Sequence, residues 1–173
     1  MDVPTPTAAL LRPLAPTDSL AELTDLLHRA YARLGAMGLN YTAVDQDEAA
    51  TGRRASRGTC LVALLDGRLV GTVCVRRGDP RDACAFYHRT DIAIVEQFAV
   101  DPALQGSGLG SRLLEAAEHL ARESGAPLAA LDTAMPAVHL IRFYASRGWS
   151  TVDETQWPGK RYRSVVMTKA LAT

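Results

Sequence analysis

Three glycines within five residues are the positions in this sequence whose chemistry is most distinctive. Gly106, Gly108 and Gly110 separate the strand-like run VEQFAV from a run with apolar residues at helical spacing. Glycine costs backbone entropy, so the cluster indicates that bare main chain is needed here. A glycine-rich turn before a helix points successive N–H groups into one concavity at the positive end of the helix dipole, which favours a bound pyrophosphate. A plain tight connection is the alternative that these residues alone leave open.

The spacing of these glycines differs from the two commonest phosphate loops, because no lysine follows and the third glycine comes one residue early for G-x-G-x-x-G. The run QGSGLG at 105–110 matches [QR]-x-x-G-x-[GA], and FYASRGW lies downstream where [FL]Y-x-x-x-G-[FWY] is expected. In these features the chain resembles the GNAT superfamily of N-acetyltransferases. The resemblance covers essentially the whole chain in element order and is sharpest from Val95 to Trp149.

The resemblance implies that acetyl-coenzyme A lies against the strand before the glycines. Loop N–H groups would bind its pyrophosphate, and the pantetheine arm would pair with strand main chain like a short extra strand. This pairing requires the fourth and fifth strands to splay apart through a bulge that the sequence does not reveal. The cofactor-binding residues implied are Phe98, Ala99, Val100, Gln105, Gly106, Ser107, Gly108, Leu109, Gly110 and Ser111.

Two side chains carry the catalytic roles that the resemblance implies. An alkylammonium is mostly protonated at neutral pH, so a base must take a proton, directly or through water. Glu96 matches a catalytic glutamate of some members, and its apolar neighbours would raise its pKa on partial burial. Tyr144 matches the tyrosine that protonates the departing thiolate. The alternatives are a Glu96 that faces solvent or pairs an arginine, and a Tyr144 that is a core residue.

One position departs from the family pattern. Many members place an asparagine seven residues before the tyrosine, where this chain has Ala137, so a side-chain contact to the cofactor is missing. His139 and Asp132 are nearby titratable groups, which we interpret as a packing residue and a structural acceptor. No His, Cys and carboxylate spacing indicates a metal site.

The acceptor amine is the least determined part of the reaction, because family acceptors range from small amines to peptides and protein termini. The run GLNYTAVDQDE offers Tyr41, Asp45, Asp47 and Glu48 to a cationic substrate, whereas QWPGKRYRS offers basic groups to an anionic one. Either run is also compatible with a plain polar loop. The leading hypothesis is an acetyl-CoA-dependent N-acetyltransferase that acts on a small-molecule or peptide amine by direct attack in a ternary complex. The alternative is a catalytically inactive acyl-CoA-binding sensor.

The elements that must position these residues form a mixed α/β pattern over a single domain, 1–173, with about seven strands and about four helices. The central sheet is expected to be mixed and largely antiparallel, because a hairpin turning at Asp66-Gly67 comes early. The predicted strands are 9–16, 59–65, 68–75, 91–100, 128–134, 148–157 and 160–171. The predicted helices are 20–34, capped by Ser19 and Glu22, 45–57, 109 to Gly125, and 136–148 with Pro136 in its first turn.

Composition indicates a soluble, cytoplasmic protein. Nineteen basic residues balance nineteen acidic ones, so no global field draws the chain to nucleic acid or membrane. The first residues lack the pattern of a signal peptide, and three cysteines without C-x-x-C spacing argue against disulfides or zinc. We interpret Arg53, Arg54 and Arg57 as a solvated helix face. A homodimer is compatible with the family but is not indicated by any residue.

Overall fold

A computed structural model describes residues 8–172, which form a seven-stranded sheet in the order β1-β2-β3-β4-β5-β7-β6. The first seven residues of the expected domain and its last one lie outside this description. The strands are β1 Leu10–Pro13, β2 Thr59–Leu65, β3 Arg68–Arg77, β4 Ile92–Val100, β5 Leu128–Ala134, β6 Ser150–Thr155 and β7 Ser164–Ala170. The helices are α1 Leu20–Ala36, α2 Thr42–Asp45, α3 Glu48–Ala55, α4 Leu109–Glu123 and α5 Val138–Ala145, with 3-10 turns at Ala85–His88 and Pro102–Leu104.

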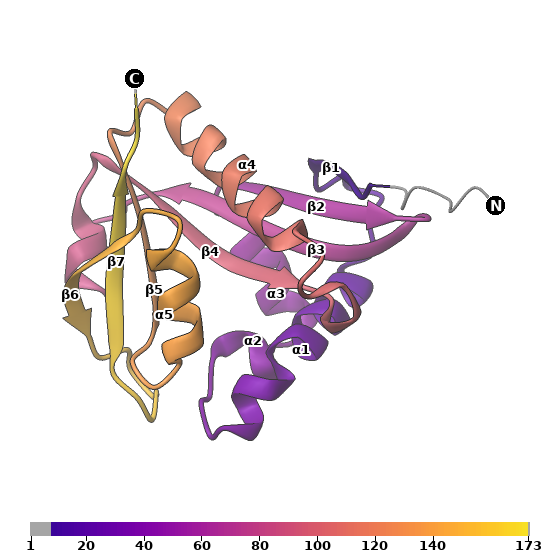
Figure 1. Cartoon of the computed structure of the whole chain (residues 1–173), viewed down its shortest axis with the longest axis horizontal. Coiled ribbons are helices and arrows are strands. Elements are labelled where there is room, and N and C mark those ends of the chain that lie inside the picture. The colour runs from indigo at the N-terminus through magenta and orange to yellow at the C-terminus, as the bar shows by residue number, and fades with distance from the viewer. Residues whose placement is uncertain (1–7, 173) are drawn as a thin grey trace.

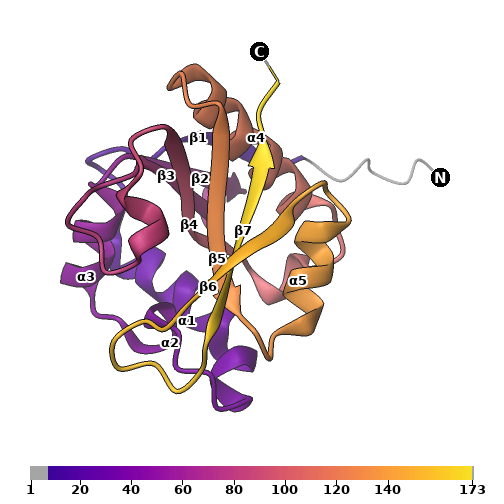
Figure 2. The ribbon, with the colours of Figure 1, turned by 90° about the vertical axis from the view of Figure 1, so that its left-hand side faces the viewer.

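The sheet is mixed and largely antiparallel, as predicted, because only β4 and β5 run parallel to each other. Figures 1 and 2 show α4 and α5 on one face of the sheet and α1, α2 and α3 on the other. The core under α4 holds Leu113 and Ala117 against strand residues of β2 to β5, and the core under α1 is built on Leu23 and Leu27. The two amphipathic helices therefore clamp the strands that carry the candidate site.

The strands β4 and β5 separate after a short parallel pairing (Figure 1). They pair only from Ile92 to Ile94. Beyond that point the β3–β4 register shifts by one residue, and Gln97 takes a left-handed φ of 52°, which marks a bulge in β4. Main-chain groups on the second half of β4 consequently have no partner strand on the β5 side.

Several local predictions need correction. The helix expected at 45–57 is α3, which begins only at Glu48, because Asp47 caps it by accepting a hydrogen bond from the Ala50 amide; the separate short helix α2 precedes it. Pro136 precedes α5 instead of lying in its first turn. Ser19 caps α1 as predicted, but Glu22 accepts from the Leu69 amide on β3 rather than completing a capping box.

The cysteines are free and buried throughout the described part of the chain. Cys84 packs with Tyr87 and Ile92, and burial raises the pKa of its thiol. None of the helices in residues 8–172 has both the length and the apolar character needed to cross a bilayer.

Candidate active site

Two adjoining cavities open beside the separated end of β4. One, of about 510 Å³, runs along the glycine loop and the start of α4, and we call it the loop cavity. The other, of about 350 Å³, lies between α3 and the β6–β7 connection, and we call it the charged cavity. Tyr31, Phe98 and Tyr144 line both, so these three aromatic side chains form the wall between them. A molecule in the loop cavity would therefore have one end close to a second molecule in the charged cavity.

The glycine loop presents free amides to the loop cavity. Gly106 and Gly108 have φ values of 81° and 88°, a left-handed conformation that a side chain makes costly. Within residues 8–172, no acceptor is bonded to the amides of Gly106, Gly108, Gly110 or Ser111. These N–H groups lie at the N-terminus of α4, where the helix dipole adds partial positive charge. The loop is thus built to bind an anion.

The second half of β4 supplies the other wall of the loop cavity. The Asp101 amide donates to the carbonyl of Val70 on β3, so alternation along the strand turns the main-chain groups of Val100 and Phe98 away from β3. The Tyr31 hydroxyl donates to the Phe98 carbonyl at 2.8 Å, which confirms that this carbonyl is not used by β3. Residues 98 and 100 thus face the gap between the strands, as the extra-strand pairing requires.

Arg147 is a cation in this cavity that the sequence interpretation missed. Its guanidinium donates to the Ser111 hydroxyl at 2.5 Å and stacks 3.8 Å from the centre of the Phe143 ring. Its other hydrogen bonds go to the Phe143 carbonyl and to Ser146, and it forms no ion pair with a described carboxylate. Because it lies beside the free amides of the α4 start, it extends their positive surface.

Tyr144 occupies the wall between the cavities. It lies on α5, packs against Phe98, Phe143 and Trp149, and is only 8% exposed. Burial raises the pKa of its hydroxyl well above the usual value, so it remains protonated at neutral pH. Unlike Tyr31, it makes no hydrogen bond to another described residue.

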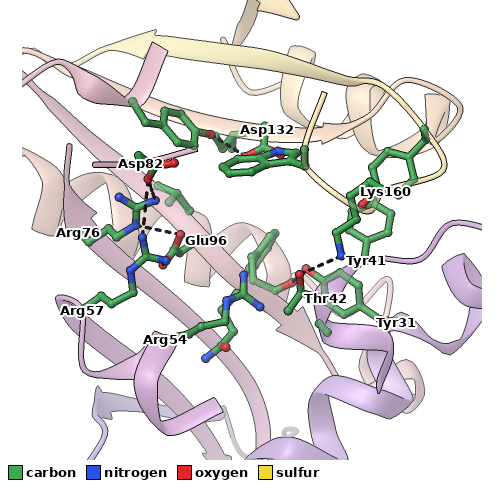
Figure 3. Close-up of a pocket in the computed structure, with 18 of the residues that line it drawn as sticks. Tyr31, Tyr41, Thr42, Arg54, Arg57, Arg76, Asp82, Glu96, Asp132 and Lys160 are labelled. Atoms are coloured by element: carbon green, nitrogen blue, oxygen red, sulfur yellow. Dashed lines mark hydrogen bonds and ion pairs between the residues drawn. The ribbon is translucent and has the colours of Figure 1, made fainter. Parts of the chain in front are cut away.

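Glu96 points into the charged cavity from β4 (Figure 3). Its Oε2 accepts a hydrogen bond from Arg76 Nε at 3.0 Å, and Arg57 lies 3.5 Å from its Oε1. Phe98 and Val95 line the same cavity, but the groups that contact the carboxylate itself are the two arginines, which the sequence did not indicate. Oε1 is buried and ion-paired with Arg57, and among the described residues no donor forms a hydrogen bond to it.

The remaining titratable candidates have structural partners or lie elsewhere. Asp132 lies within β5 and accepts hydrogen bonds of 2.7 Å from both Tyr87 and Trp157, while burial raises its pKa. His139 lines the loop cavity. Ala137, at the departure from the family pattern, is fully buried before α5.

The comparison with family profiles decides the classification. The profile of the acetyltransferase (GNAT) family matches residues 20–149, from α1 to the residue before β6. The chain belongs to this family. Three predictions are thereby confirmed: that the chain is a GNAT protein, that it has the mixed α/β fold, and that it is an N-acetyltransferase.

Similar proteins support the same family. The S-(2-succino)cysteine N-acetyltransferase of Bacillus subtilis is 28% identical over 152 residues, which cover 87% of this chain and 89% of that protein. The aminoalkylphosphonate N-acetyltransferase of Salmonella typhimurium is 31% identical over 88 residues, 51% of this chain and 54% of that protein. A GNAT acetyltransferase of Elizabethkingia anophelis, solved with acetyl-CoA bound, superposes with a TM-score of 0.68 at 15% identity, over 95% of this chain and 99% of that one.

In this GNAT acetyltransferase the basic run at 53–57 is only partly the solvated face that the sequence suggested. Arg53 and Arg57 are exposed and Arg54 is half-buried, but Arg54 and Arg57 also line the charged cavity, together with Lys160 from the β6–β7 connection. The acidic residues considered for a cationic substrate, Asp45, Asp47 and Glu48, line a separate surface hollow with His28. The sequence showed Arg54 and Lys160 only as members of two separate basic runs, and nothing in it indicated that they line one cavity.

Proposed function

We propose that the chain is a single N-acetyltransferase domain that transfers an acetyl group from acetyl-CoA to a primary amine of a small molecule or peptide, by direct attack in a ternary complex. The observation that carries this proposal is the meeting of two cavities at Tyr144, one lined by free loop amides and one by charged side chains. Direct attack needs both reactants to approach one point, and this wall provides it.

The loop cavity fits coenzyme A in three respects. The unpartnered amides from Gly106 to Ser111 and the helix dipole suit a pyrophosphate, and Arg147 suits a phosphate oxygen. The outward-facing main chain of Phe98 and Val100 suits the amides of a pantetheine arm. When bound, acetyl-CoA supplies the thioester carbonyl that the amine attacks. GNAT relatives use this cofactor, which supports its assignment to this chain.

Tyr144 is proposed as the acid. Its hydroxyl is protonated at neutral pH, is not engaged by the protein, and lies where the loop cavity ends. In this position it can donate a hydrogen bond, and then its proton, to the sulfur that leaves. No other hydroxyl on this wall is free in the described structure, because Tyr31 is bonded to Phe98.

Glu96 is proposed as the base. Arg76 binds Oε2 and holds the carboxylate in place. Oε1, which is ion-paired with Arg57 but accepts no hydrogen bond from a described residue, is the oxygen proposed to take a proton from the amine, directly or through water. Nothing in residues 8–172 favours the acyl-CoA-binding sensor considered from the sequence. The names of the two relatives, S-(2-succino)cysteine and aminoalkylphosphonate N-acetyltransferase, support a small-molecule amine as the acceptor.

The function is tested by two measurements on the purified protein. Calorimetry with acetyl-CoA should give saturable binding that is lost when Gly108 is replaced by valine, since the required left-handed backbone is strained for that residue. Incubation with acetyl-CoA and a panel of amines should release free thiol. Binding that the substitution does not affect, or a panel without thiol release, would contradict the proposal.

Arg147→Gln is expected to raise the KM for acetyl-CoA about tenfold or more, because a charge-assisted hydrogen bond to a phosphate is lost. The kcat at saturating cofactor should change little, since Arg147 lines only the loop cavity and is not part of the wall that the two cavities share. The control is Arg142→Gln, an exposed arginine on α5 that does not line the loop cavity. Steady-state kinetics at two salt concentrations check this, and equal KM values for both variants would contradict the phosphate contact.

A further inference from the structure

The charged cavity contains two kinds of cation. Arg57 and Arg76 are matched by carboxylates: Arg76 binds Asp82 at 2.6 Å and Glu96 at 3.0 Å, and Arg57 lies 3.7 Å and 3.5 Å from the same two groups. Figure 3 shows these four side chains gathered on one side of the cavity. Their charges balance, so this cluster offers little net attraction to a charged ligand.

Arg54 and Lys160 have no such partners. Arg54 donates to the side-chain oxygen of Gln46 at 2.8 Å, and Lys160 donates to the Asn40 carbonyl at 2.7 Å and to the Thr42 hydroxyl at 3.1 Å. All of these acceptors are neutral, and neither cation forms an ion pair with a carboxylate of residues 8–172. Both side chains reach into the cavity, Arg54 from α3 and Lys160 from the β6–β7 connection (Figure 3). Each keeps donor capacity that its neutral partners do not fill.

The electrostatic potential around Arg54 and Lys160 is positive. Burial, together with the like charge of Arg54, lowers the pKa of the Lys160 ammonium, and the opposing effect of Asp45 is the smallest of the three. The one further acid on the wall, Asp132, is occupied by Tyr87 and Trp157 and directs neither oxygen to a cation. An anion bound between Arg54 and Lys160 would remove their repulsion, whereas a second cationic group on a substrate would add to it.

We propose that the acceptor is a primary amine that also carries an anionic group, a carboxylate or a phosphonate, and that Arg54 and Lys160 bind this group while the amine faces Glu96 and Tyr144. The inference rests on the proposed acetyl transfer and names the substrate class for it. A planar guanidinium binds such oxygens in a bidentate manner, and an ammonium adds a second charge-assisted bond from the facing wall. The two kinds of cation would thus have different roles. Arg57 and Arg76, which are paired with carboxylates, surround the proposed base, and Arg54 and Lys160 bind the anionic group of the acceptor.

The test compares acceptors that carry an anionic group with counterparts in which that group is neutral or absent. Glycine, β-alanine and 4-aminobutyrate are assayed against their own amides, and 2-aminoethylphosphonate against ethanolamine, with acetyl-CoA and thiol release as the readout. The acids should be preferred by about tenfold or more in kcat/KM, the size expected for a charge-assisted contact. In Arg54→Gln and in Lys160→Met the preference should fall about tenfold. Arg53→Gln, the adjacent exposed arginine on α3, should keep it.

Three results would overturn this assignment. The amides could be acetylated as well as the acids, the preference could survive both cavity substitutions, or the dependence on Arg54 could be seen only with succinyl-CoA, in which case the cations bind the acyl group. Calorimetry of the same acids and amides in the presence of coenzyme A tests the anion site separately from the proposed acetyl transfer. Preferential binding of the acids without thiol release contradicts acetyl transfer and retains the anion site, whereas thiol release without preference contradicts the anion site.

Discussion

Replacing Tyr144 with phenylalanine is expected to lower kcat about a hundredfold while acetyl-CoA affinity changes by less than about twofold. The substitution removes one hydroxyl and leaves the ring, which packs against Phe98, Phe143 and Trp149. Because the hydroxyl bonds to no other described residue, no buried partner is left unsatisfied, and stability should be kept. The hydroxyl is therefore a group whose loss should affect the reaction and little else.

Three measurements separate this role from a structural one. Steady-state kinetics give kcat and KM, calorimetry gives the acetyl-CoA dissociation constant, and thermal unfolding checks the fold. A variant with unchanged kcat would remove Tyr144 from the mechanism. A fall in kcat accompanied by an equal fall in cofactor affinity would assign the hydroxyl to binding instead of proton donation.

The glycine loop, the proposed pyrophosphate site, was predictable because its backbone conformation restricts which residues can occupy it. Left-handed backbone at Gly106 and Gly108 restricts those positions to glycine, so the amide cradle can be inferred from residue types alone. The bulge in β4 was not predictable, because its left-handed residue is Gln97, and a glutamine in a strand-like run gives no sign of a positive φ. Buried contacts of that side chain with Gln46 and Cys74 accompany the conformation, and these are tertiary.

The charged cavity was the part least accessible to sequence reasoning. Arg54 follows an exposed arginine on a short polar helix, so its periodicity resembles that of a solvated face. Its role depends on α3 packing beside α1 and on Lys160 arriving from the opposite end of the chain. In the same way, the arginine partners of Glu96 come from β3 and from the turn after α3, which no local pattern connects. Side chains that meet across distant segments are placed by the fold, whereas a turn is encoded by its own residues.

Glu96→Gln is expected to lower kcat/KM for the amine about a hundredfold near neutral pH, because the variant cannot take a proton from the acceptor. The deficit should shrink as pH rises. An alkylamine with a pKa near about 10.4 becomes neutral in a fraction that grows about tenfold per pH unit, and a neutral amine needs no base before it attacks. The ratio of wild-type to variant rate, measured from about pH 7 to about pH 9, should therefore fall steadily.

Asp82→Asn is the matched control for this experiment. It also removes one carboxylate from the cluster around Arg76, at a residue that is at least as buried, but Asp82 lies beyond Arg76 and is not the proposed base. If Glu96 acts as the base, the control should lose less than about tenfold in kcat/KM, and its deficit should not depend on pH in this range. Equal losses in the two variants, or a Glu96→Gln deficit that stays constant with pH, would mean that the arginine cluster needs its charge balance and that the proton leaves by another route. The comparison distinguishes the two because both variants disturb the same arginines, and only Glu96→Gln removes the carboxylate that is proposed to take the proton.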